Sequence, residues 1–164
     1  MVKYTDTQVT FSEVPDEITL CINISGCPNH CEGCHSAYLA EDIGNELTAN
    51  EVLRLIDLNP GITCIAFMGG DQDPKYINFL ANVIKEGENL PKVAWYSGRQ
   101  ELAKDIDLEN FDVIKLGPYL PAKGPLNNPN TNQRMYKVQK FYNSNAFGSP
   151  TTVLDDITYK FWNK

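Results

Sequence analysis

Residues 26–36, GCPNHCEGCHS, hold three of the five cysteines and both histidines of this 164-residue chain. The three cysteines, Cys27, Cys31 and Cys34, follow the spacing C-x3-C-x2-C. Thiols this close in sequence belong to one short loop, so they can meet around a single bound group. The first question is which group that loop binds, and which fold holds the loop in place.

The composition of the chain limits the kinds of protein to which this loop can belong. The chain has 14 Lys and Arg against 21 Asp and Glu, a net charge of −7, and no basic run that would bind nucleic acid. The N-terminal sequence MVKYTDTQVTF lacks the pattern of a secretion signal, and no apolar run approaches the roughly 20 residues that span a membrane. We therefore expect a cytoplasmic protein, whose thiols are metal ligands or free rather than disulfides.

The length fits one domain, and strand and helix patterns alternate along it. We expect a single domain over residues 1–164, with a loose or partly helical C-terminal extension from about residue 142. Strands are predicted at 17–25, 63–70, 92–98, 111–117 and near 135–141. Helices are predicted at 48–58, where Thr48 and Glu51 form a capping box, at 75–87, and around 100–104. This β-α-β order predicts an α/β fold with a mainly parallel sheet.

Several polar or glycine-rich features follow the predicted strands directly. The cysteine loop follows the first strand, Gly69-Gly70-Asp71 the second, and Ser97 the third. A Pro- and Asn-rich segment, residues 117–133, follows the fourth. Ligands in parallel α/β folds bind at the carboxyl ends of the strands, so we expect these features to share one rim.

Zinc, haem and a disulfide fit the cysteine loop less well than an iron–sulfur cluster does. Structural zinc usually takes two separated ligand pairs, although His30 or His35 leaves a zinc site open. CEGCH matches the haem-attachment pattern C-x-x-C-H, but covalent haem normally requires export. The remaining thiols, Cys21 and Cys64, lie in apolar strands and are expected to be buried.

A four-iron cluster normally takes four ligands, usually cysteine thiolates. Three cysteines on one loop hold three irons and leave the fourth for a small molecule. An amine and a carboxylate can chelate that iron, and S-adenosylmethionine (SAM) carries both groups. The chemistry of such a site belongs to the cofactor rather than to acid–base side chains.

The spacing C-x3-C-x2-C after the first strand resembles the radical SAM family. GCPNHCEGCHS is similar to the loop of the small activating enzymes of anaerobic ribonucleoside-triphosphate reductase. FMGGDQDP (67–74), AWYSGR (94–99) and NTNQRMYKV (130–138) resemble further segments of those enzymes. The resemblance covers residues from about 19 to 138. It implies an incomplete (βα) barrel of mainly parallel strands.

The resemblance also implies roles for individual residues. Cys27, Cys31 and Cys34 would ligate a [4Fe-4S] cluster. The SAM contacts would be Gly33, Cys34, His35, Gly69, Gly70, Asp71 and Ser97. Asp71 is shorter than the glutamate common in the family, which leaves Asp73 as a substitute for the acidic contact.

The implied activity is reductive cleavage of SAM and abstraction of hydrogen from a glycine of the reductase. The implied partners are the large subunit of that reductase and an electron donor such as flavodoxin. Asn132, Gln133 and Arg134 would face the partner. In the structural alternative, Asn132 and Arg134 would satisfy backbone carbonyls instead. Two other hypotheses stay open: an activase of another glycyl-radical enzyme such as pyruvate formate-lyase, and a non-catalytic zinc-binding module.

For the smaller features a purely structural reading also exists. Gly69 and Gly70 can form an ordinary turn at a strand end. Asp71 can cap the helix that follows, and Ser97 can belong to a turn. Only the cysteine triplet points to a bound group without support from the predicted rim.

Overall fold

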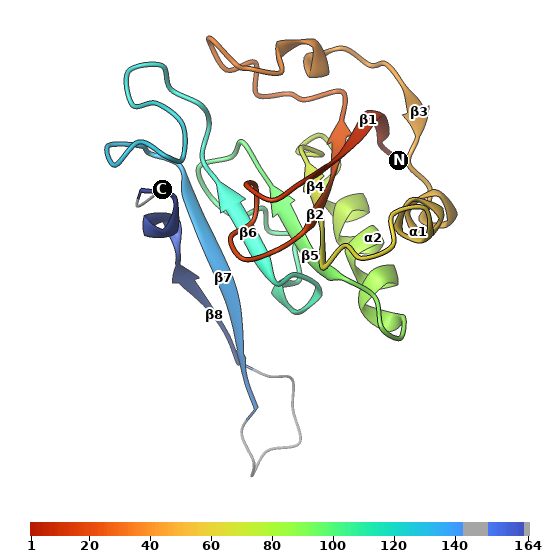
Figure 1. Cartoon of the computed structure of the whole chain (residues 1–164). Helices are drawn as coiled ribbons and strands as arrows, with labels where there is room; N and C mark the ends of the chain where they lie inside the picture. Colours follow the sequence, from red (N-terminus) through yellow and green to blue (C-terminus); the bar gives the residue numbers. More distant parts are fainter. Residues whose placement is uncertain (143–150, 163–164) are drawn as a thin grey trace.

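The computed structural model describes residues 1–142 and 151–162, which form one eight-stranded sheet with two α-helices on one side (Figure 1). The strands are β1 (Lys3–Thr10), β2 (Thr19–Ile24), β3 (Asn45–Glu46), β4 (Cys64–Met68), β5 (Lys92–Tyr96), β6 (Val113–Leu116), β7 (Arg134–Phe141) and β8 (Thr151–Asp156). The helices are α1 (Ala49–Asp57) and α2 (Pro74–Glu86), with 3-10 turns η1 (Ala37–Ala40), η2 (Leu108–Asn110) and η3 (Thr158–Phe161).

The sheet is mixed, with the order β3-β1-β2-β4-β5-β6-β7-β8. Strands β2, β4, β5 and β6 pair in parallel, as the β-α-β pattern predicts. Strands β1, β3, β7 and β8 add antiparallel pairs at the two flanks, so the expectation of a mainly parallel sheet holds only for the centre. Within the described ranges β3 and β8 do not pair with each other. The α/β class is confirmed, and the barrel is not closed.

Helix α1 confirms its predicted N-terminal cap, whereas α2 is capped by a residue that was not predicted. Thr48 accepts a hydrogen bond from the backbone N–H of Glu51 and caps α1. Asp73 caps α2 through the N–H of Tyr76, and Pro74 occupies the first turn, where its missing N–H costs nothing. Helix α2 ends at Gly87, as expected.

The predicted helix around residues 100–104 was wrong. These residues form bends and turns, and no helix is assigned there. The segment is too short to offset the cost of starting a helix. Leu102 and Ala103 instead pack against the core from an irregular backbone, and Asn78 of α2 accepts a hydrogen bond from the N–H of Asp107.

Three strands were missed. Strand β1 lies in the N-terminal segment, the two-residue β3 lies before α1, and β8 lies in the segment expected to be loose or partly helical. The expected extension from about residue 142 falls partly at 143–150, outside the described residues. From residue 151 the chain forms β8 against β7, followed by η3, which buries Thr158.

The central strands divide their side chains between two different environments. On the helix side, large residues such as Ile22, Phe67 and Trp95 are fully buried in the main core. On the other side, the same strands present smaller residues, including Cys21, Ala66 and Ala94. Because successive residues of a strand point to opposite faces, one face is packed by helices while the other keeps space near its strand ends.

Trp95 connects the main core to the carboxyl ends of the strands. Its ring is fully buried, and its indole N–H donates to the carbonyl oxygen of Gly69 at 2.8 Å. Gly69 in turn donates its N–H to the carbonyl of Tyr96 at 3.0 Å. A large core side chain therefore fixes the turn that begins the Gly-Gly-Asp sequence.

In the part of the chain that the structure describes, no helix has the length and apolar character needed to cross a membrane.

We predict that Trp95→Phe lowers the free energy of unfolding of the metal-free protein by about 2 kcal/mol. The substitution leaves a void in the core and removes the donor to the buried Gly69 carbonyl. Urea unfolding followed by circular dichroism measures this change.

The matched control is Trp162→Phe, because Trp162 is 37% exposed. This change is expected to cost about 0.5 kcal/mol or less. Equal losses in the two variants would contradict the anchoring role of Trp95.

Candidate metal and cofactor site

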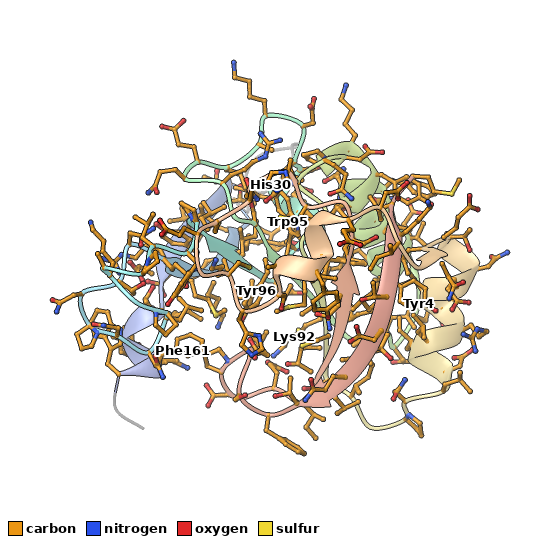
Figure 2. The ribbon with its side chains drawn as sticks, turned by 90° about the horizontal axis from the view of Figure 1, so that it is seen from above. Tyr4, His30, Lys92, Trp95, Tyr96 and Phe161 are labelled. Carbon is orange, nitrogen blue, oxygen red and sulfur yellow. The ribbon has the colours of Figure 1, made fainter. Side chains whose placement is uncertain are left out.

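The cysteine loop, residues 25–36, leaves the carboxyl end of β2 and crosses the top of the sheet in Figure 1. His30 and Gly33 have positive φ angles, 44° and 68°, which turn the chain sharply on both sides of Cys31. Seen from above in Figure 2, His30 lies over the sheet, between Tyr4 on the α1 side and Phe161 on the η3 side. The expected position of the loop at the rim is therefore observed.

All three loop cysteines line one cavity of about 190 Å³. Each thiol is free and only partly exposed. His30, Ser36, Ala37 and Ala40 complete the lining. Among the described residues, no group of three or more His, Cys, Asp or Glu side chains is arranged closely enough to hold a metal ion. The residue types still suit a thiolate-bound metal group, because three soft sulfur donors line one partly apolar hollow, although they are not close enough together to form a metal site in this structure.

Cys21 and Cys64 are buried in the small-residue face of the sheet, as expected. Burial raises the pKa of Cys21 to about 12 and raises that of Cys64 further. Both thiols are therefore kept neutral at physiological pH. They are poor candidates for metal ligands, and they serve as controls for the loop cysteines.

Gly69 and Gly70 follow β4 with φ angles of 108° and 95°, a conformation that favours glycine. A Cβ on Gly70 would press against the side chain of Ile77 at 2.5 Å, and one on Gly69 would lie 3.2 Å from the carbonyl oxygen of Ile24. These glycines therefore have a structural reason to be present, whatever they bind. The turn brings Asp71 back over the ends of the strands.

Asp71 is 1% exposed, and its carboxylate accepts three hydrogen bonds. The donors are the hydroxyl of Ser97 at 2.6 Å, the side-chain amide of Asn29 at 2.5 Å and the backbone N–H of Gly98 at 2.8 Å. The guanidinium of Arg99 lies 3.7 Å from the carboxylate and donates to the Asp71 carbonyl at 2.8 Å. Asp71 does not cap α2, which Asp73 does.

The sequence predicted Asp71 and Ser97 as SAM contacts, and the structure gives both of them internal partners. Ser97 is 1% exposed, donates to Asp71 and accepts from the N–H of Arg99 at 3.1 Å. Direct contact of either side chain with a ligand would require the exchange of one of these hydrogen bonds. Their observed effect is to connect the cysteine loop to the ends of β4 and β5.

A second cavity of about 600 Å³ is lined in part by the cysteine loop. His35 lines it from the cysteine loop, directly after Cys34 of the first cavity. Met68, Tyr96 and Lys115 line it from the ends of β4, β5 and β6. A volume of several hundred cubic ångströms is typical of a site for a small organic ligand.

Lys115 places a buried positive charge at this second cavity. The residue is 8% exposed, and its ammonium donates to the carbonyl of Gly117 at 2.7 Å, its one hydrogen bond among the described residues. Burial lowers the pKa of Lys115 to about 8, while negative charge on the loop cysteines and on Asp71 acts in the opposite direction. The ammonium thus lies within electrostatic range of the thiols and has donors left for an anion.

The Pro- and Asn-rich segment, residues 117–133, approaches the cysteine loop and lines part of the second cavity. A Cβ on the exposed Gly33 would lie 3.5 Å from the side chains of Tyr119 and Pro121, and residues 125–127 line the second cavity. The segment holds itself in place by internal hydrogen bonds, including that from Thr131 to the Gly124 carbonyl at 3.0 Å.

The three residues predicted to face a partner differ in their contacts. Asn132 donates to the Pro118 carbonyl at 2.9 Å, and Arg134 donates to the Thr131 carbonyl at 3.1 Å. Both therefore satisfy backbone carbonyls. Gln133 is buried and lines the second cavity.

Sequence reasoning missed two residues of this site, Lys115 and Asn29. Lys115 lies inside a predicted apolar strand, FDVIKLG, and the available signal was a single lysine between the apolar residues Ile114 and Leu116. Asn29 lies between two cysteines, where an asparagine reads as ordinary loop composition. Its partner Asp71 is distant in sequence, so the contact has no local signature.

Comparison with models of known protein families found no match, and searches of curated proteins and of solved structures found no similar protein. An assignment of function to this chain therefore depends on its own residues and their geometry.

We predict that Asp71→Asn lowers the free energy of unfolding of the metal-free protein by about 3 kcal/mol. The new amide would place an N–H₂ group against donors that now point to a carboxylate. Urea unfolding of the metal-free protein measures the loss.

Asp73→Asn is the matched control, because asparagine caps a helix about as well as aspartate does. A loss at position 73 as large as that at position 71 would show that Asp71 has no special role.

Proposed function

We propose that this chain is a radical SAM enzyme that carries a [4Fe-4S] cluster on Cys27, Cys31 and Cys34. Its substrate protein is the large subunit of anaerobic ribonucleoside-triphosphate reductase, on which it installs a glycyl radical. One observation above all supports this proposal: three thiols line a single hollow at the ends of the parallel strands. A larger cavity with a buried cation is lined by His35, the residue that follows Cys34 in the chain.

Such a cluster, when bound, supplies the electron that splits SAM into methionine and an adenosyl radical, which becomes 5′-deoxyadenosine by taking hydrogen from the glycine. The electron comes from a small donor such as flavodoxin. This chemistry requires a reducing compartment, so we propose a cytoplasmic location. The chain's own residues bind and orient the cofactor, and none is needed as a general acid or base.

The second cavity is proposed to receive the rest of SAM. Gly33 and His35 would lie against the adenosyl group, and the turn at Gly69 and Gly70 would border the methionine end. Lys115 is the candidate partner for the methionine carboxylate, because a buried ammonium with free donors is stabilised by an anion. No other lysine lines this cavity among the described residues.

The radical has to reach a glycine of another protein, so that protein must approach the second cavity closely. We propose that residues 117–133, which include Gln133, and the following Arg134 receive it, because this segment already borders the cavity. Asn132 would support that surface through its hydrogen bond to Pro118.

Two other functions use the same residues. An activase of a different glycyl-radical enzyme, such as pyruvate formate-lyase, would need the same cluster and cavity. A zinc-binding module is favoured by one observation, since His30 lines the thiol cavity and completes a Cys₃His set.

The deciding experiment uses protein reconstituted with iron and sulfide without oxygen. We expect roughly four irons per chain, 5′-deoxyadenosine from SAM and a reductant, and a glycyl-radical doublet in electron resonance when the reductase subunit is added. Replacing any one of Cys27, Cys31 and Cys34 by serine is expected to abolish all three signals.

Cys21→Ala and Cys64→Ala are the controls and are expected to keep the iron. If the glycyl-radical doublet forms on pyruvate formate-lyase and not on the reductase subunit, the substrate protein of this enzyme is pyruvate formate-lyase. If the protein binds zinc and no iron, and His30→Ala loses that zinc, the enzymatic proposal is overturned.

We predict that Lys115→Met weakens SAM binding by the reconstituted protein about tenfold or more, because a charge-assisted hydrogen bond contributes about 1.5–3 kcal/mol. Methionine keeps the volume of the side chain. Equilibrium dialysis with labelled SAM measures the affinity, and the iron content of the variant should stay unchanged.

Lys92→Met is the matched control, since Lys92 lies at the opposite end of the sheet and pairs with Glu17. An unchanged affinity of Lys115→Met for SAM would show that Lys115 does not bind SAM.

A further inference from the structure

Asn29 makes contacts with both halves of the site. Its side-chain amide donates one hydrogen to Asp71 at 2.5 Å, and the same nitrogen lies 3.7 Å from the sulfur of Cys27, within range of an N–H···S hydrogen bond. An amide nitrogen carries two hydrogens, so both contacts can be made together. Asn29 is thus the one described side chain that bridges a loop thiol and the buried carboxylate.

The contact with Asp71 fixes the loop to the strand ends. Asp71 is held by Ser97 and Gly98, which follow β5, while Asn29 comes from the loop after β2. The loop also hydrogen-bonds to its own return segment, from the N–H of Cys27 to the Leu39 carbonyl at 2.9 Å. Asn29 therefore adds a side-chain attachment close to Cys27, where a displacement would move a ligand sulfur.

Gly98 gives independent evidence that this position is built for Asn29. The φ angle of Gly98 is one that any residue adopts, so its backbone does not require glycine. A Cβ at Gly98 would nevertheless collide with the side-chain amide of Asn29. Glycine at position 98 leaves room for Asn29 and lets the Gly98 N–H reach the same carboxylate oxygen, Oδ2 of Asp71.

We propose that Asn29 is a positioning residue, which holds the cysteine loop on Asp71 and presents its second amide hydrogen to the sulfur of Cys27. The second part of this inference rests on the proposed function. A hydrogen bond to a ligand sulfur stabilises the more negative, reduced state of an iron–sulfur cluster and so raises its reduction potential. Asn29 would then help the site accept the electron that the reaction needs.

The first test needs no metal. Hydrogen exchange of the metal-free protein, read by mass spectrometry, should show several-fold faster exchange at residues 26–39 in Asn29→Ala and in Gly98→Ala. In the double variant, Gly98→Ala should add little, because the amide it displaces is already absent. Asn82→Ala, on the outer helix α2, is the control and should leave the loop unchanged.

The second test uses reconstituted protein and a redox titration followed by electron resonance. Asn29→Ala should shift the midpoint to a more negative potential, with the iron content unchanged. A protein that binds no iron refutes the proposed function, while the exchange experiment still decides whether Asn29 holds the loop. Unchanged exchange in Asn29→Ala overturns the positioning role, and an unchanged midpoint overturns the contact with the sulfur.

Discussion

The carboxylate of Asp71 lies in a place that water scarcely reaches. A buried carboxylate is costly unless hydrogen-bond donors replace its hydration. Here the donors come from the cysteine loop after β2 and from the residues after β5, while Asp71 itself follows β4. One buried charge therefore holds three chain segments together at the rim. The relative position of the thiols and the second cavity depends on this contact.

The division of the sheet into a packed face and a hollow face explains where the cavities lie. Ile22, Phe67 and Trp95 fill the helix side, so little space remains there. The opposite face carries Ala66 and Ala94 at its centre and opens toward Met68, Tyr96 and Lys115 at the strand ends. The net charge of the chain is −7, yet it buries one cation, Lys115, near its three loop thiols.

Much of the fold followed from local signals. The apolar strands at the centre, the capping residue Thr48 and the order β-α-β are encoded within a few residues, and the structure confirms them. The second helix is capped by Asp73, where the sequence had suggested Asp71. The flanking strands were less visible. Strand β1 has only one buried residue, Tyr4, and β8 is mostly exposed, so neither has the apolar run that marks a central strand.

The candidate site also combines features that local sequence predicts with features that it does not. The three cysteines could be grouped from their spacing alone, because thiols on one short loop are near one another whatever fold carries them. The meeting of the cysteine loop with Asp71 and Ser97 at one rim followed from the rule that parallel strands expose their carboxyl ends together. The sequence by itself thus determined the thiol set and the rim. Only the tertiary structure decided that Asp71 and Ser97 bond internally, that Lys115 is buried beside the second cavity, and that Asn29 joins Cys27 to Asp71. These contacts join residues far apart in the chain, and burial and hydrogen-bond geometry are properties of the packed molecule.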